Sequence, residues 1–148
     1  MRNRIYALAA MYSGPHLQEV SMMIDMDLAV EEVGAQMLRA MAHPFRIRLL
    51  EVLAAEEECV CHLVSLFDKP QPYISQQLAA LKEVGLVRDR RVAQRVFYRV
   101  ADPRITHLLS DIKVLAGGTP ELLSRHDPVA GCNCPKCEIA GAQLPEQR

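Results

Sequence analysis

The chain has 148 residues, of which half are apolar and 24% are charged, a composition typical of one folded domain and not of a disordered chain. Its net charge of −1 gives the whole chain no attraction to nucleic acid, yet residues 69–104 hold eight basic and three acidic side chains, which predicts one basic face. No apolar run reaches the roughly 18 residues of a membrane helix, and five cysteines in two tight groups argue against a secreted disulfide framework, so we expect a cytoplasmic protein.

Three segments are expected along the chain. Residues 1–26 are predicted to be a disordered N-terminal extension, residues 27–118 a folded domain, and residues 119–148 a cysteine-containing C-terminal tail. The folded segment is where hydrophobic periodicity is regular, and the sequence shows no internal repeat.

Two helices are predicted at the start of the folded domain. Between Asp27 and Met41 apolar residues recur at steps of three and four, which is helical spacing, and Asp27 is a suitable N-cap. Pro44 is well placed as the first residue of the next helix, which should run to about Glu56. Its expected buried residues are Phe45, Leu49, Val52 and Leu53, and its expected exposed residues are Arg46, Arg48 and Glu51.

A pair of shorter amphipathic helices is predicted next. The first covers residues 59–67, a turn follows at residues 68–70, and the second covers residues 71–84. Gly85 is expected to end the second helix as the residue just past its C-cap. Two amphipathic helices joined by so short a turn are the helix–turn–helix signature.

The hydrophobic period then changes from helix to strand. Residues 86–90 and 95–100 are β-rich runs, which predict a β-hairpin. The hairpin is basic and directly follows the second helix of the pair, the recognition helix, so we interpret it as a wing. A last helix is expected from Asp102-Pro103 to the Gly117-Gly118 pair. The predicted fold is therefore mainly α with a small β-hairpin wing, a winged helix–turn–helix. The first and last helices are apolar on one face and suit a two-fold homodimer, whose recognition helices would lie about 34 Å apart on a palindromic operator.

The candidate DNA-binding residues lie on the second helix of the pair and on the wing. Glutamine can pair bidentately with adenine, so we expect the base-reading residues to be Ser75, Gln76 and Gln77. Phosphate contacts fix the register of a protein on DNA, and the candidates for them are Gln71, Tyr73, Arg88, Arg90, Arg91 and Arg95.

The candidate metal ligands are the five cysteines: Cys59, Cys61, Cys132, Cys134 and Cys137. Thiolates are soft ligands that suit arsenite, cadmium, lead, zinc, copper(I) or an iron–sulfur cluster better than magnesium or calcium. Residues two apart in a regular helix point about 200° apart, so the pair at 59 and 61 can share one ion only if the helix start is frayed or bent. Chelation would then distort the helix that braces the recognition helix.

The three tail cysteines are enough for a trigonal arsenite or lead site, and a fourth thiolate from the first pair would complete a tetrahedral zinc or cadmium site. Three arrangements remain open. The tail joins the first pair, in its own or in the partner subunit; it forms a separate site; or it is an unstructured metal-scavenging or redox tail. His62 and His126 could each add a ligand, although histidines near a surface are usually solvated.

Four segments of the chain together resemble the ArsR/SmtB family of winged-helix metal-sensing repressors. They are residues 38–50, residues 58–63 (Glu-Cys-Val-Cys-His-Leu), residues 74–87 and residues 95–100. The resemblance implies operator DNA as the partner and Cys59 and Cys61 as inducer ligands. This sequence departs from the family at Gln77, where a histidine is usual, and at His62, where an aspartate is usual. The family's second metal site needs an Asp-x-His pair, and residues 102–104 do not supply one.

We therefore expect a metal(loid)-responsive transcriptional repressor that binds operator DNA as a homodimer. It would release the DNA when arsenite, or in second place cadmium or lead, binds the thiolates; zinc is also possible. The alternatives are a redox, persulfide or iron–sulfur sensor of the same fold, or a cytosolic metal-sequestering protein with a vestigial helix–turn–helix. No catalytic constellation is present in the sequence, so an enzyme is not expected.

Overall fold

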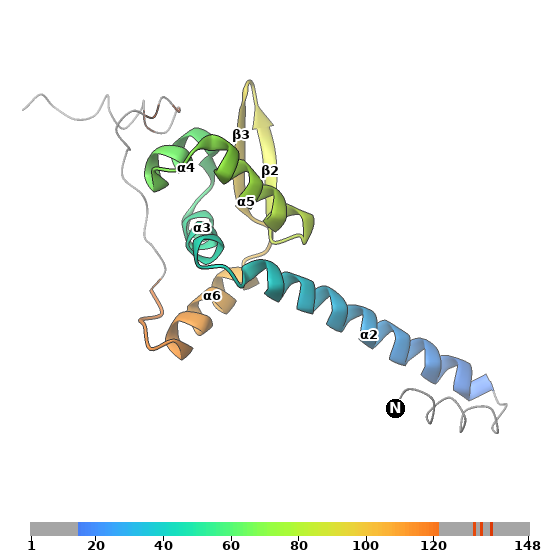
Figure 1. The fold of residues 1–148 in the computed structure, drawn as a ribbon. Helices are drawn as coiled ribbons and strands as arrows, with labels where there is room; N and C mark the ends of the chain where they lie inside the picture. Colours follow the sequence, from blue (N-terminus) through green and yellow to red (C-terminus); the bar gives the residue numbers. More distant parts are fainter. Residues whose placement is uncertain (1–14, 122–131, 133, 135–136, 138–148) are drawn as a thin grey trace, which may run out of the picture. The chain divides into compact units, whose positions relative to one another are not determined.

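The computed structural model describes residues 15–121 together with Cys132, Cys134 and Cys137, and side chains from Met26 onward. Its elements in chain order are α2 (Pro15–Met41), α3 (Pro44–Ala55), β1 (Glu58–Cys59), α4 (Val60–Phe67), α5 (Gln71–Glu83), β2 (Val87–Val92), β3 (Arg95–Val100) and α6 (Arg104–Leu115) (Figure 1). This mainly helical chain with one small antiparallel sheet confirms the predicted winged helix–turn–helix. Among the described residues, no helix combines the length and apolarity needed to cross a lipid bilayer.

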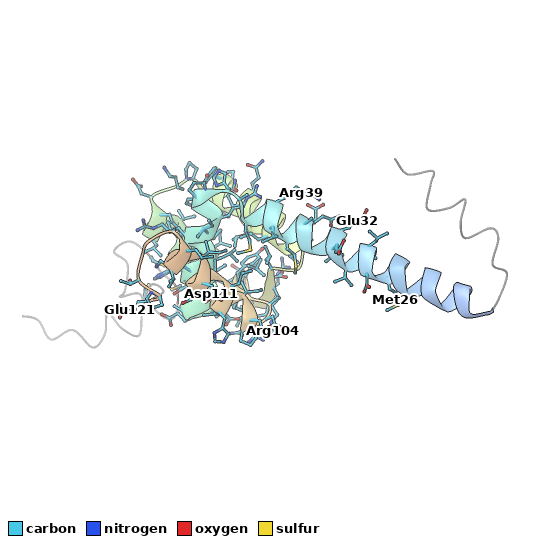
Figure 2. The ribbon with its side chains drawn as sticks, turned by 90° about the horizontal axis from the view of Figure 1, so that it is seen from below. Met26, Glu32, Arg39, Arg104, Asp111 and Glu121 are labelled. Carbon is cyan, nitrogen blue, oxygen red and sulfur yellow. The ribbon has the colours of Figure 1, made fainter. Side chains whose placement is uncertain are left out.

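The chain divides into two compact units, residues 1–36 and residues 37–148, and α2 begins in the first. This helix starts at Pro15 and not at Asp27, so residues 15–26, expected to be disordered, are helical. The reason is local, because proline suits a first helical position and no glycine or proline interrupts residues 16–33. Large apolar side chains are exposed along it, among them Met26 and Val30 at 65% and 70%; Figure 2 shows Met26 and Glu32 projecting from this helix.

The core of the second unit lies between α3, α4, α5 and α6. It is made of fully buried aliphatic side chains, including Leu49, Leu50, Val52, Leu53, Leu63, Ile74, Leu78, Leu81 and Leu109. Glu51 was expected to be exposed, and this is wrong: it is only 7% exposed, and its carboxylate lies 3.2 Å from the Nζ atom of Lys113 on α6. A buried carboxylate requires a partner of opposite charge, and α6 supplies one from a distant part of the sequence.

The sheet has three strands in the order β1-β3-β2, one more than the predicted hairpin. The hairpin pairs Val87 with Val100 and Val92 with Arg95, and the added strand pairs Glu58 with Tyr98 and Cys59 with Phe97. A strand of two residues is too short to show a hydrophobic period, so the sequence did not reveal it. The strand that contains Cys59 is therefore hydrogen-bonded to the wing itself.

Gly85 ends α5 as predicted, and its role can be tested. Its N–H donates to the carbonyl of Lys82 at 3.0 Å, the N–H of Leu86 donates to the carbonyl of Leu81 at 2.9 Å, and its φ is +75°. A Cβ at this position would meet no atom within 4 Å, so the cost of a substitution comes only from backbone strain at positive φ. We expect Gly85→Ala to lower the free energy of unfolding by about 1 kcal/mol, measured by urea denaturation.

Gly34 provides the matched control for this prediction. It lies in the interior of α2 and a Cβ there also meets no atom within 4 Å, but its φ is not in the left-handed region. We expect Gly34→Ala to leave the free energy of unfolding unchanged or raise it by up to about 1 kcal/mol, because alanine has the higher helix propensity. Equal stability of Gly85→Ala and the parent protein would contradict the argument from φ.

Candidate metal centre and DNA-binding face

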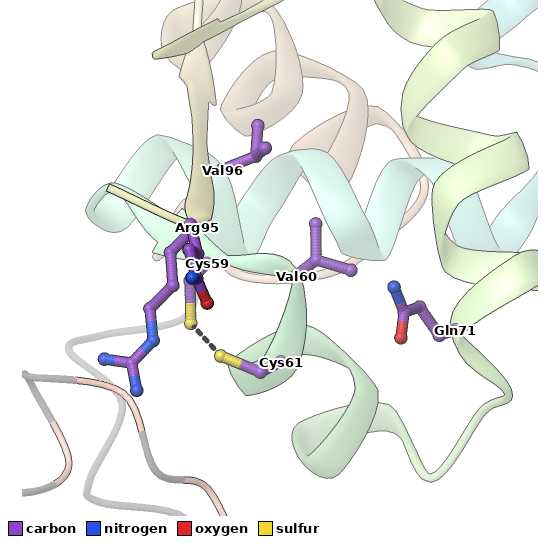
Figure 3. A pocket seen from close by; sticks show the side chains of 7 residues that line it. Cys59, Val60, Cys61, Gln71, Arg95 and Val96 are labelled. Atoms are coloured by element: carbon purple, nitrogen blue, oxygen red, sulfur yellow. Dashed lines mark hydrogen bonds between the residues drawn. The ribbon is translucent and has the colours of Figure 1, made fainter. Parts of the chain in front are cut away.

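Cys59 and Cys61 lie at the junction between β1 and α4. Cys59 is the last residue of the strand and the N-cap of the helix, with an extended backbone (φ −81°, ψ 155°), and its Sγ accepts the N–H of His62 at 3.3 Å. The helix thus begins after Cys59, and the two Sγ atoms lie 2.6 Å apart (Figure 3). The expected obstacle of opposite helical faces does not arise, and the pair can share an ion without unwinding α4.

The three tail cysteines are buried against this junction in the same protomer. Cys132, Cys134 and Cys137 form one buried cluster with Cys59, and Phe97 of β3 packs against it. Two sets of ligand atoms result, each with all its members within 4.8 Å of one another. We call them the three-thiolate group (Cys59, Cys61, Cys132) and the four-ligand group (His62, Cys132, Cys134, Cys137).

His62 is a site residue that sequence reasoning undervalued. Its side chain is completely buried, its Nδ1 lies 3.2 Å from the Sγ of Cys137, and its Nε2 lies 3.7 Å from the Oε2 of Glu58. The position of this histidine directly after the two cysteines was the available signal. His126, the other histidine considered as a ligand, lies outside the described residues.

Burial sets the ionisation of the thiols. It raises the pKa of the Cys132 thiol to about 12, and it raises the pKa of Cys59, with a further contribution from the hydrogen bond to Cys61. Burial would also raise the pKa of Cys134, but hydrogen bonds from the Cys137 backbone and from neighbouring thiols outweigh it, and the pKa is lowered. Because a metal binds thiolates, ion binding at Cys59 and Cys132 would release protons.

A pocket of about 200 Å³ opens beside the first cysteine pair (Figure 3). Its lining comes from the β1–α4 junction, from the first residue of α5 and from the start of β3: Cys59, Val60, Cys61, Gln71, Gln94, Arg95 and Val96. Cys61 is the exposed member of the three-thiolate group, so an ion has access from this side. The same pocket connects the thiols to the recognition helix and to the wing.

The predicted base-reading residues do not share one environment. Ser75 and Gln76 are exposed on α5. Gln77 is only 7% exposed, and its Oε1 accepts a hydrogen bond of 2.8 Å from the Nε of Arg46. Gln77 therefore points inward and joins α5 to α3. Tyr73 is half-buried, with its ring 5.0 Å from that of Phe45.

The predicted phosphate-binding arginines lie on the wing, where Arg90 is paired with a carboxylate. Arg88, Arg90 and Arg91 are exposed, whereas Arg95 is partly buried beside the pocket. Arg90 donates from Nε to both carboxylate oxygens of Glu57 at 2.8 Å and lies over the ring of Phe97. This guanidinium lowers the pKa of Glu57. The pair ties β2 to the residue that precedes β1.

Comparison with known proteins identifies the central part of the chain. The profile of the family described as "Bacterial regulatory protein, arsR family" matches residues 43–89. The chain is 37% identical over 86 residues to the HTH-type transcriptional repressor SmtB of Mycobacterium tuberculosis, an alignment that covers 58% of this chain and 64% of that protein. It thus spans a little under two thirds of that relative's length.

Two further proteins are similar over a larger share of their own length. A transcriptional repressor SmtB homolog of Synechocystis is 31% identical over 99 residues, which cover 66% of this chain and 75% of that protein. The homodimeric winged helix–turn–helix domain Mb0332 of Mycobacterium bovis, titled a possible ArsR-family transcriptional regulator, superposes with a TM-score of 0.59 at 30% identity, covering 63% of this chain and 86% of that one.

Proposed function

This chain belongs to the ArsR family of bacterial transcriptional regulators, and from that premise we propose that it is a metal(loid)-responsive repressor that binds operator DNA as a homodimer. The members of this family are transcriptional regulators and not enzymes, which confirms both expectations for this chain. Residues 27–118 would carry DNA binding and dimerisation, and residues 119–148 would supply further metal ligands. A sensor that uses free thiols as ligands is suited to the cytoplasm, because cysteines are kept reduced there.

The observation that carries this proposal is that Cys59 and Cys61 lie directly beside the elements proposed to bind DNA. Cys59 is paired through its backbone with Phe97 of the wing, and the pocket beside Cys61 is also lined by Gln71, the first residue of the recognition helix. An ion that repositions these sulfurs therefore acts on both elements that face DNA. A coupling free energy of about 1–3 kcal/mol is typical of allostery and changes affinity about 5- to 150-fold.

Arsenite is our first choice of inducer, with cadmium or lead second. The three-thiolate group brings three sulfur atoms within 4.8 Å of one another, which suits a thiophilic ion of trigonal geometry. Zinc more often takes four ligands in a closed tetrahedral shell. The three-thiolate group therefore favours arsenite over zinc as the ion that releases DNA.

For the DNA contacts, we propose that Ser75 and Gln76 reach base edges and that Gln77 positions the helix through Arg46. Phosphate contacts would come from Gln71 and from the wing arginines, Arg88, Arg90, Arg91 and Arg95, while Tyr73 mainly packs under the helix start. Because arginine contacts to phosphate make DNA affinity strongly salt-dependent, the affinity of this protein for its operator should fall as the salt concentration rises.

The homodimer is supported by apolar side chains that the described residues leave exposed. They occur on α2, where Val33 is 54% exposed, and separately on α6, where Leu115 is 87% exposed. Exposed apolar surface of this kind marks interaction sites, and the similar Mb0332 domain is described as homodimeric. A second copy of this chain is the proposed partner of both helices.

The contact between Cys59 and Cys61 also supports a second candidate, a redox sensor. With Sγ atoms 2.6 Å apart, the two thiols could form a disulfide, losing two protons and two electrons to a peroxide, which is reduced to water or to water and an alcohol. A persulfide or iron–sulfur sensor would use the same sulfurs. A protein that only sequesters metal, without regulating transcription, would not need to bind operator DNA.

The experiment that separates these candidates is operator binding followed by fluorescence anisotropy, with the DNA upstream of the protein's own gene. The reduced full-length protein would be titrated with arsenite, cadmium, lead and zinc, and with peroxide in a separate series. Release by a near-stoichiometric amount of arsenite, cadmium or lead supports the proposal. Release by peroxide alone would favour the redox sensor, and failure to bind any DNA would favour sequestration.

A further inference from the structure

We propose that the four-ligand group is a resident zinc site, separate in purpose from the inducer site and using His62 as its nitrogen ligand. The four donor atoms of His62, Cys132, Cys134 and Cys137 lie within 4.8 Å of one another. They come from α4 and from a tail about seventy residues later in the chain. Zinc binding by this group does not depend on which ion, if any, releases DNA.

The donor set matches closed zinc sites. Three thiolates with one imidazole is a ligand set of structural Zn²⁺, in which four protein ligands fill the tetrahedral shell. All four side chains are buried, from 0% exposed for His62 to 8% for Cys132, so the protein encloses the site. The three-thiolate group differs in both respects, because it has one ligand fewer and its Cys61 is exposed.

The orientation of the imidazole ring provides an independent argument. Nδ1 faces the thiols, 3.2 Å from the Sγ of Cys137, while Nε2 faces the Oε2 of Glu58 at 3.7 Å. Metal-ligating histidines commonly direct the other ring N–H toward a carboxylate, which fixes the tautomer and raises the basicity of the ligating nitrogen. Glu58 is buried, and its backbone is held by the pairing with Tyr98 in the sheet, so the residue that carries this carboxylate lies on a fixed element.

A bound cation would also offset the charge gathered here. Ionised Cys132, Cys134 and Cys137 beside a buried Glu58 would place several negative charges in a poorly solvated volume, which is costly without a positive partner. A dication offsets part of this charge and holds the tail against α4. Because Cys132 belongs to both groups, its thiolate would have to bridge the zinc and the inducing ion when both sites are filled.

The first test is made on the full-length parent protein, purified with one equivalent of zinc. Extended X-ray absorption fine structure at the zinc K-edge should show three sulfur atoms at about 2.3 Å and one nitrogen at about 2.0–2.1 Å from the zinc. A shell of four sulfur atoms, or one dominated by oxygen and nitrogen, would overturn the proposal. Because no residue is changed, this result cannot be confused with misfolding.

The second test compares three variants by zinc competition and by the visible spectrum of the cobalt-substituted protein. His62→Asn should lose the tetrahedral cobalt bands and at least about tenfold in zinc affinity. His107→Asn changes an exposed histidine, and Cys61→Ser changes a thiol outside the four-ligand group; both should retain zinc and the spectrum. Equal spectra and affinities for His62→Asn and His107→Asn would show that His62 is not a ligand.

The outcomes also keep this proposal apart from the proposed function. Cys61→Ser should retain zinc yet lose release of operator DNA by arsenite. If zinc is held with the expected ligands but no ion releases DNA, the proposed function fails and the zinc site stands. If arsenite releases DNA but the K-edge shell lacks the single nitrogen, the zinc site fails and the proposed function stands.

Discussion

Replacing Cys59 by serine is expected to abolish release of operator DNA by the inducing ion, while the ion-free protein keeps its operator affinity within about twofold. The lost response is the whole coupling free energy, about 1–3 kcal/mol, or a 5- to 150-fold change in affinity. The serine hydroxyl cannot replace a soft thiolate as a ligand. It can replace the sulfur as the N-cap of α4, where Cys59 now accepts the N–H of His62 and where serine is a preferred residue.

The measurement is operator anisotropy for Cys59→Ser with and without arsenite, cadmium and lead, beside the parent protein. Ser75→Ala is the reciprocal control, since Ser75 is exposed on α5 and outside both ligand groups. It should weaken operator binding and leave the fold-change on adding the ion unaltered. Loss of operator binding by Cys59→Ser in the absence of any ion would show that the cysteine is structural.

The largest expected effect on stability is that of Leu78→Ala, which should lower the free energy of unfolding by about 3 kcal/mol. Leu78 is completely buried on the inner face of α5, between Ile74 and Leu81. Removing a buried leucine side chain loses its transfer free energy and leaves a cavity, and such changes cost about 2–5 kcal/mol. The same side chain holds the recognition helix against the core.

Urea denaturation of Leu78→Ala and Gln76→Ala, two neighbours on α5, provides the check. Gln76 is exposed, so its change should alter the free energy of unfolding by no more than about 0.5 kcal/mol while reducing operator affinity. A loss below about 1 kcal/mol for Leu78→Ala would mean that α5 is not anchored by this face.

Much of the architecture could be predicted because its causes are local. The steps of three and four between apolar residues identified the helices, and Pro44 and Gly85 marked a start and an end that the structure reproduces. The change to β-rich residues identified the wing. Hydrophobic period and chain-breaking residues act within a few positions, so a sequence displays them directly.

The features that escaped prediction depend on partners far along the chain. Glu51 is buried because Lys113 comes to it from α6, and Gln77 turns inward because Arg46 of α3 donates to it. The strand β1 exists only through its pairing with β3. None of these partners can be read from local pattern, since each depends on how the helices pack.

The site divides in the same way. The soft sulfur ligands in two groups beside a helix–turn–helix could be predicted, because cysteine spacing and helical period are local properties of the sequence. The folded chain was needed to show that Cys132 lies with Cys59 and Cys61, and that His62 faces Cys137, seventy-five positions away in the chain. The physical reason is that burial brings the tail thiols to the β1–α4 junction, and ligand sets are defined by distances in space.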